Sequence, residues 1–164
     1  MASTNETVIW FKNVDFHYDF RKPILEEVNF NVRKGSKITI MWQNGAGKST
    51  LFKLINGGLE KKAGVINIDQ KATIATSFQV VLPEDKELSV KDFFIKYIPE
   101  DREGGVDKQI VDVLQVVNLK VKDFEKKISA FSGGQQARLL LASALIQDPD
   151  ILLLDEPTNN LDVD

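Results

Sequence analysis

The chain has 164 residues, of which 43% are hydrophobic and 27% are charged, and its formal net charge is −3. This length and balance predict one soluble globular domain, and the negative charge argues against an electrostatic, sequence-independent grip on nucleic acid. With no cysteine, no run of the ~20 apolar residues that a membrane span needs and no signal-peptide pattern at the polar start, we expect neither disulfides nor a membrane segment, and a cytoplasmic location.

The first third of the chain predicts strands joined by turns. Val28–Val32 alternates apolar and polar residues, which is typical of a strand with one buried face. Lys34-Gly35 predicts a turn, and Lys37–Met41 predicts a buried strand. A helix is expected from Ser49 until Gly57-Gly58 stops it. Two further strands are expected at Val65–Ile68 and Ala72–Phe78.

The rest of the chain predicts helices and one buried strand. The segment from Ser89 to Asp92 resembles a capping box and predicts a short helix through Ile98, after which Pro99–Gly105 is expected to be a loop. Ile151–Leu154 is four consecutive aliphatic residues, which is typical of a strand buried on both faces of a parallel sheet. This order predicts an α/β architecture. Two longer helices are expected at Val106–Leu119 and Gly133–Gln147.

A glycine-rich loop lies between the strand expected at 37–41 and the helix that follows it. Its residues are Asn44-Gly45-Ala46-Gly47-Lys48-Ser49-Thr50. In this context the backbone N–H groups and the helix N-terminus can surround phosphate oxygens. We expect Lys48 to neutralise the β- and γ-phosphates of a nucleotide, and the Ser49 hydroxyl to reach Mg²⁺. The alternative is a glycine-rich turn that binds nothing.

One position departs from the phosphate-loop pattern. The pattern G-x-x-x-x-G-K-[ST] begins with glycine, where this chain has Trp42. If the backbone there needs a left-handed or strained conformation, tryptophan costs ~1–3 kcal/mol. We therefore hypothesise that Trp42 weakens nucleotide binding. The alternative is that Trp42 extends the preceding strand and leaves Asn44–Ser49 intact, and the sequence leaves both open.

Two more motifs follow near the end of the chain. Ser132-Gly133-Gly134-Gln135 opens a predicted helix and predicts a second anion site, although such a start also serves simply as an N-cap. Asp155 and Glu156 follow the buried strand, at the edge where α/β sheets bind ligands. We expect Asp155 to hold Mg²⁺ through water and Glu156 to orient or deprotonate the attacking water. The alternative is an acidic turn that ends the strand.

Taken together, these motifs resemble those of an ABC ATPase domain. Gln79 falls where that family places its Q-loop glutamine, a metal and water ligand. Tyr18 falls where the family has the aromatic residue that stacks on adenine, with Phe20 as a substitute. In chain order, the segments similar to the family's Walker A, signature, Walker B and D-loop are Gly45–Thr50, Ser132–Gln135, Leu154–Pro157 and Asn160–Asp162.

The resemblance implies a P-loop NTPase core, in which a mostly parallel sheet is flanked by helices, with an N-terminal antiparallel β region and a short helical subdomain. The ATP-binding core is expected at 1–78 and 130–164, and the Q-loop and helical subdomain at 79–129. The family continues past the D-loop with a helix and a strand that leads to a switch histidine. We therefore expect an incomplete core and a marginally stable chain, unless the sheet closes up or a partner supplies the strand. His17 is no candidate for the switch histidine.

The activity implied is ATP binding and hydrolysis with Mg²⁺, and two such domains pair head to tail, so that ATP lies between the Walker A of one and the signature of the other. The second domain is another copy or part of another chain. The short segment from Gln79 to Ser132 and the run 130–162 resemble soluble ABC-F proteins, which act on the ribosome. The alternatives are an ATPase subunit of a membrane transporter and a catalytically impaired fragment. For this chain we expect little turnover.

Overall fold

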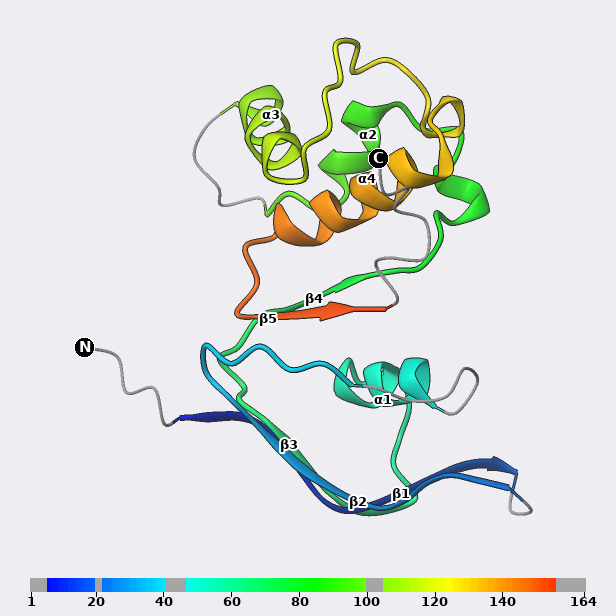
Figure 1. The fold of residues 1–164 in the computed structure, drawn as a ribbon, viewed down its shortest axis with the longest axis vertical. Coiled ribbons are helices and arrows are strands. Elements are labelled where there is room, and N and C mark those ends of the chain that lie inside the picture. Colours follow the sequence, from blue (N-terminus) through cyan, green and yellow to red (C-terminus); the bar gives the residue numbers. More distant parts are fainter. Residues whose placement is uncertain (1–5, 20–21, 41–46, 100–104, 156–164) are drawn as a thin grey trace. The chain divides into compact units, whose positions relative to one another are not determined.

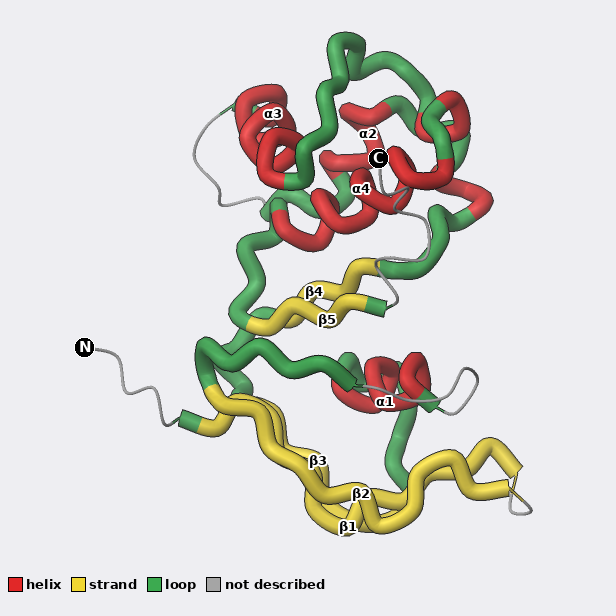
Figure 2. The backbone as a smooth tube through the Cα atoms, in the orientation of Figure 1, coloured by secondary structure: helices red, strands yellow, loops and turns green. Residues whose placement is uncertain are grey.

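The computed structural model describes residues 6–19, 22–40, 47–99 and 105–155. Its contacts divide the chain into two compact units, which we call unit 1 (Met1–Ala72) and unit 2 (Thr73–Asp164). Figures 1 and 2 show the elements of each unit along the chain. Each unit is described by itself.

Unit 1 is built on a three-stranded antiparallel sheet with the order β2-β1-β3. Its strands are β1 (Thr7–Asp19), β2 (Lys22–Arg33) and β3 (Ala63–Ile68). Phe11 on the central strand pairs with Phe30 on one side and Ile66 on the other, and the two phenylalanine rings stack with centroids 4.5 Å apart. The alternating burial of β2 from Val28 to Val32 confirms the strand predicted there.

The β1–β3 pairing is irregular at one point, and glycine is required there. Asn13 on β1 has φ 48°, and the register shifts between Lys12 and Asp15. Opposite this shift, Gly64 has φ +81°, and a Cβ on it would lie 2.1 Å from the Asn13 carbonyl oxygen. The close approach of two backbones therefore explains why this strand contains glycine.

The helix α1 (Lys48–Ile55) follows the glycine-rich loop, as predicted. Leu51, Leu54 and Ile55 are buried on one side of it. The helix ends before Gly57, which has φ +73°, a conformation that glycine adopts without strain. Lys34-Gly35 forms the predicted turn.

The strand expected at Lys37–Met41 is not present in the described residues 37–40, so this prediction was wrong for them. Residues 37–39 are exposed, and Ile38 has 53% of its surface accessible. A parallel strand forms only where a neighbour pairs with its backbone and elements cover its faces. Met41 lies outside the described residues.

Unit 2 contains the two predicted strands, β4 (Ile74–Ser77) and β5 (Ile151–Leu154), and they pair in parallel. Asp150, just before β5, is hydrogen-bonded to Thr73, just before β4. Its Oδ2 accepts from the backbone N–H (2.9 Å) and the hydroxyl (3.0 Å) of Thr73. Burial of β5 on both faces is only partly realised, because Ile151 and Leu153 are buried but Leu154 is 38% exposed. The faces of a parallel sheet are covered by elements packed against them and not by its own strands.

The helices of unit 2 begin where the sequence predicts and end earlier. Asp92 N–H donates to Ser89 Oγ (3.0 Å) at the start of α2, so the predicted N-cap is confirmed. A last turn after α2 is continued by a hydrogen bond from the Ile98 N–H to the Phe94 oxygen (3.2 Å). The helices are α2 (Val90–Ile95), α3 (Val106–Val116) and α4 (Gly133–Leu145), with short 3₁₀ turns at Pro83–Asp85 and Ile128–Ala130.

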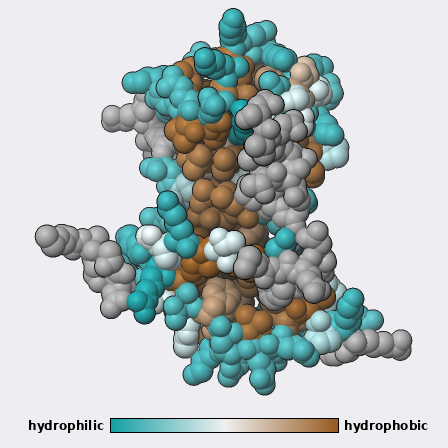
Figure 3. All heavy atoms as spheres, viewed as in Figure 1, coloured by the Kyte–Doolittle hydropathy of each residue, from teal (hydrophilic) through white to brown (hydrophobic). Residues whose placement is uncertain are grey.

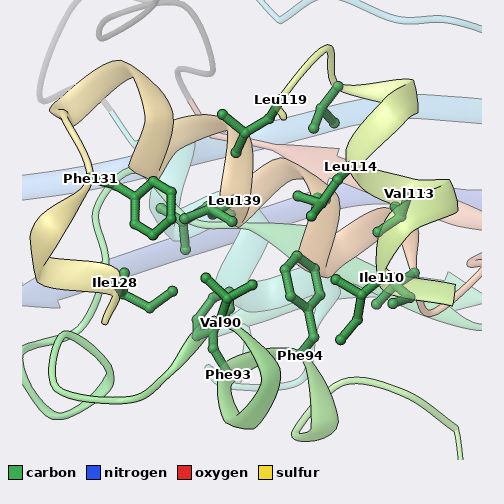
Figure 4. Close-up of a cluster of buried hydrophobic side chains, with 14 of the residues drawn as sticks. Val90, Phe93, Phe94, Ile110, Val113, Leu114, Leu119, Ile128, Phe131 and Leu139 are labelled. Carbon is green, nitrogen blue, oxygen red and sulfur yellow. The ribbon is translucent and has the colours of Figure 1, made fainter. Parts of the chain in front are cut away.

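A single apolar cluster joins these helices, and Figure 4 shows its central side chains. Phe93 and Phe94 are fully buried, and each contributes about 1.5–3 kcal/mol by leaving water. On the face that Figure 3 shows, hydrophilic side chains gather at the outer end of this helical part. The cluster draws on all three helices and the turn before α4, with Val90, Phe93, Phe94, Ile110, Val113, Leu114, Leu119, Ile128, Phe131 and Leu139.

The predicted fold class is confirmed: an antiparallel region at the N-terminus, a parallel pair and helices make an α/β structure. Because the core cluster of unit 2 runs from Val81 to Ile146, it includes both the predicted helical subdomain and residues after 130. The boundaries at 78 and 130 stay predictions. None of the helices in the described residues is long and apolar enough to cross a membrane.

Candidate functional site

The described part of the glycine-rich loop is Gly47–Thr50, where the loop turns into α1. Gly47 is the N-cap residue with φ +114°, and a Cβ on it would lie 2.7 Å from Ile24 Cγ2. The backbone therefore needs glycine immediately before Lys48. Lys48 and Ser49 are the first two residues of α1, so their N–H groups belong to the end of the helix that attracts anions. Asn44, Gly45, Ala46 and Trp42 lie outside the described residues.

Tyr18, the predicted adenine-stacking residue, lies against this helix. Its hydroxyl is 3.2 Å from Thr50 Oγ1, and either group can donate the hydrogen bond. The Tyr18 ring is 62% exposed and meets the Phe16 ring edge to face, with centroids 4.9 Å apart. An accessible aromatic face is thus held beside the first turn of α1. Phe20, the predicted substitute, lies outside the described residues.

The ends of the parallel strands bring two predicted metal ligands to one edge of unit 2. Ser77 pairs with Leu154, and the Asp155 N–H donates to the Ser77 carbonyl oxygen at 3.3 Å. Gln79 follows β4 by two residues, so Gln79 and Asp155 both lie just past the carboxyl ends of adjacent strands. Glu156, the predicted catalytic carboxylate, lies outside the described residues.

These residue types fit a magnesium ion. Mg²⁺ prefers oxygen ligands and retains water, and Ser49, Gln79 and Asp155 offer a hydroxyl, an amide oxygen and a carboxylate. Among the described residues, no group of three or more His, Cys, Asp or Glu side chains is arranged to hold a metal ion. Ser49 belongs to unit 1, and Gln79 and Asp155 belong to unit 2.

The signature segment forms a complete capping box at the start of α4. The Gln135 N–H donates to Ser132 Oγ (3.3 Å), and the Ser132 N–H donates to Gln135 Oε1 (3.0 Å). The N-cap alternative is therefore realised. It does not remove the anion-binding groups, because the first N–H groups of the helix, those of Gly133 and Gly134, have no acceptor within a helix.

A hollow elsewhere in unit 1 includes none of the predicted site residues. It has a volume of about 710 Å³ and is lined by residues such as Trp10, Asn31 and Asn67. Most of its lining residues carry polar side chains, and we place no function there.

Comparison with known proteins identifies the group to which these motifs belong. The family model described as "ABC transporter" matches residues 25–159. The chain is 32% identical over 173 residues to the zinc uptake system ATP-binding protein ZurA of Listeria monocytogenes, which covers 96% of this chain and 66% of the relative. It is 31% identical over 166 residues to ABC transporter F family member 5 of Arabidopsis thaliana, covering 99% of this chain and 23% of that protein.

The fold is also similar to that of a solved ATP-binding cassette. A dimeric ATP-binding cassette in a post-hydrolysis state, bound to ADP and Pi, matches with a TM-score of 0.78 and 26% identity, over 94% of this chain and 76% of that one. The chain spans less than two thirds of the length of the curated relatives named above.

Proposed function

Because the chain belongs to the ABC transporter family of ATP-binding domains, we propose that it binds Mg-ATP through the loop before α1 and contributes to its hydrolysis. The observation that carries the proposal is the start of α1, where Gly47 takes a conformation that suits glycine, Lys48 begins the helix, and the exposed Tyr18 ring lies beside it. A helix N-terminus followed by a lysine favours phosphate, and an aromatic face favours a base.

Each residue has a separate task in this proposal. Asn44, Gly45, Ala46 and Gly47 provide backbone N–H groups, Lys48 compensates phosphate charge, and Thr50 orients Tyr18 on the adenine. Ser49, Gln79 and Asp155 hold Mg²⁺, which offsets charge on the phosphates when bound. Glu156 positions water for attack on the γ-phosphate, as general base.

A second domain completes the site in this proposal. In a head-to-tail pair, the signature residues Ser132, Gly133, Gly134 and Gln135 bind the γ-phosphate of the ATP that the partner holds. The similar dimeric cassette supports such a pair. Here the partner is a second copy of this chain or an ABC domain of another chain.

For the parent protein we favour an ABC-F-like cytoplasmic ATPase that acts on the ribosome. The helical segment between Gln79 and Ser132 is small, with α2 of six residues and α3 of eleven. The F family relative supports this branch, whereas ZurA supports a transporter motor. Expressing the parent and separating ribosomes from membranes would distinguish the two, since co-sedimentation with membranes would rule out the ribosomal branch.

The first test is a calorimetric titration of Mg-ATP into the 164-residue chain, its Lys48→Ala variant and its Trp42→Gly variant. We expect the unsubstituted chain to bind Mg-ATP, Lys48→Ala to lose binding, and Trp42→Gly to bind more tightly. Equal affinities of the unsubstituted chain and Lys48→Ala would refute the phosphate-loop assignment. Equal affinities of the unsubstituted chain and Trp42→Gly would refute only the hypothesis that Trp42 weakens binding.

Turnover is tested separately by phosphate release. We expect slow release that disappears in Glu156→Gln, because the amide cannot accept a proton from water. Release that is unchanged in Glu156→Gln would contradict the assignment of the general base. Absent release with intact ATP binding would instead favour the impaired nucleotide-binding module.

A further inference from the structure

The peptide group that enters the signature is held at both of its polar ends by side-chain amides. This is the group formed by the carbonyl of Phe131 and the N–H of Ser132. Gln136 Nε2 donates to the Phe131 oxygen at 2.9 Å, and the Ser132 N–H donates to Gln135 Oε1 at 3.0 Å. Because a peptide group is planar, fixing both ends fixes its rotation, and with it the backbone at Ser132.

The capping box accounts for only one of these two hydrogen bonds. In the common pattern at a helix start, the residue before the N-cap and the residue at the fourth helical position are both apolar and pack together. Here Phe131 keeps its ring in the core, where it is 7% exposed, and the fourth helical position is Gln136. Gln136 is partly buried and uses its amide as a donor to the main chain.

The other groups of Phe131 are held as well. Its N–H donates to the Ile128 oxygen at 3.2 Å, and Lys126 Nζ lies 4.3 Å from the centre of its ring. The Lys126 carbonyl in turn accepts the Val90 N–H at the start of α2 (3.0 Å). Other contacts thus hold the ring and the N–H of Phe131. Its carbonyl is held by the Gln136 bond, which acts together with the Gln135 bond to the Ser132 N–H of the same peptide group.

We propose that Gln136 is a positioning residue for the signature. It holds the 131–132 peptide so that the Ser132 hydroxyl accepts from the Gln135 N–H and keeps its hydrogen for a phosphate oxygen, beside the N–H groups of Gly133 and Gly134. The phosphate is that of a nucleoside triphosphate bound to a second ABC domain, so the inference rests on the proposed function. Gln136 touches no substrate itself.

The test uses a pair with one working composite site. One chain, the signature donor, carries Lys48→Ala, and the other, the ATP holder, carries Ser132→Ala; both carry Glu156→Gln to slow hydrolysis. In a head-to-tail pair only the holder's phosphate loop and the donor's signature are intact together. Mg-ATP-dependent pairing is measured by analytical ultracentrifugation.

Gln136→Met keeps the length of the side chain and removes its donor, whereas Gln136→Arg retains a donor. In the signature donor, we expect Gln136→Met to weaken pairing about 3–10-fold, the usual effect of one lost hydrogen bond, and Gln136→Arg to restore it. The same Gln136→Met change in the ATP holder should leave pairing unaltered. An equal loss in donor and holder would mean a general structural effect and would overturn the proposal, as would no loss in either.

A second measurement separates this inference from the proposed function. If the donor and holder chains with Gln136 unchanged do not pair in Mg-ATP, the proposal that two domains share an ATP site is wrong. The positioning role is then decided by the amide NMR shifts of Ser132 and Gln135 in the single chain. They should move in Gln136→Met and return in Gln136→Arg, while those of Ile110 in α3 stay fixed; unmoved Ser132 and Gln135 shifts would reject the positioning role.

Discussion

Replacing Gly64 with alanine should break the β1–β3 pairing of unit 1. With φ +81° at this position, a residue with a side chain costs about 1–2 kcal/mol in backbone strain. In addition, the new Cβ would lie 2.1 Å from the Asn13 oxygen, 2.5 Å from its carbon and 2.6 Å from the Lys12 oxygen. These are main-chain atoms of the neighbouring strand, so no side chain can turn away to make room.

The overlap forces the strands apart where Lys12 pairs with Val65 and Asp15 with Ala63. Losing about two ladder hydrogen bonds at about 1 kcal/mol each, together with the strain, predicts that Gly64→Ala lowers the free energy of unfolding by about 3–4 kcal/mol. A change of that size is large for a small domain and is confined to a few physical causes.

The matched control is Gly35→Ala. Gly35 also has a positive φ, +74°, but a Cβ there meets nothing within 4 Å. It should lose only the backbone strain, about 1–2 kcal/mol. Both variants are compared by urea unfolding followed by circular dichroism, with slopes checked for two-state behaviour. If the losses of unfolding free energy in the two variants agree within about 0.5 kcal/mol, which is the size of ordinary non-additivity between sites, the steric argument is wrong.

Three further changes test single contacts. Lys96→Met leaves the buried Asp85 carboxylate without its cation and should lower stability by about 1–2 kcal/mol, less than for a fully buried pair because Lys96 is 45% exposed. The hydrogen bond from Lys96 to Asp85 raises the pKa of Lys96, so this contribution is present below about pH 10.5 and fades as the pH rises through the raised pKa. The difference in urea midpoint between the unsubstituted chain and Lys96→Met should therefore be smaller at about pH 11 than at about pH 7. Asp150→Ala removes the acceptor of two Thr73 donors and should cost about 1–2 kcal/mol, seen as a lower urea midpoint and not as a changed slope. Tyr18→Phe should keep ATP affinity within about twofold while Tyr18→Ala loses about tenfold or more, by calorimetry, because stacking and not the hydroxyl supplies the energy.

Features with a local chemical cause could be predicted from the sequence. The start of α4 follows from Ser132 and Gln135, whose side chains satisfy the first N–H groups of the helix. The end of α3 also has a local signal in the sequence. Asn118 adopts φ 51°, and the Leu119 N–H donates to the Leu114 oxygen at 2.9 Å, which is the hydrogen bond of a Schellman ending. An asparagine at this position therefore indicates that the helix ends there.

Features that depend on distant neighbours could not be predicted. The segment 37–40 has the composition of a strand, yet a strand needs partners whose positions its own residues do not specify. The role of Gln136 is hidden for the same reason, since a glutamine in a helix usually faces water, and only the structure shows the Phe131 carbonyl within reach. The proposed ligand Asp155 follows from its place after a buried strand, and Gln79 follows from the family resemblance. Their common edge follows only from the β4–β5 register.

The same register makes a prediction about local stability. β4 and β5 form a two-stranded pair, and parallel pairs depend on being covered by other elements. Leu154 is 38% exposed, whereas Leu139 in the helical core is fully buried. We therefore expect the pair to open without unfolding of the helical core, so that its amides exchange at least about tenfold faster than core amides.

Native-state hydrogen exchange followed by NMR checks this order. The informative amides are those of Ile151, which donates to the Thr73 oxygen at 3.0 Å, and Asp155, which donates to the Ser77 oxygen at 3.3 Å. Protection equal to that of Leu139 would mean that the pair opens only with the core, which would contradict the expectation. If Asp155 and Gln79 hold Mg²⁺ as proposed, saturating Mg-ATP should slow exchange at Ile151 and Asp155 more than at Leu139, because a ligand stabilises only the closed state that binds it.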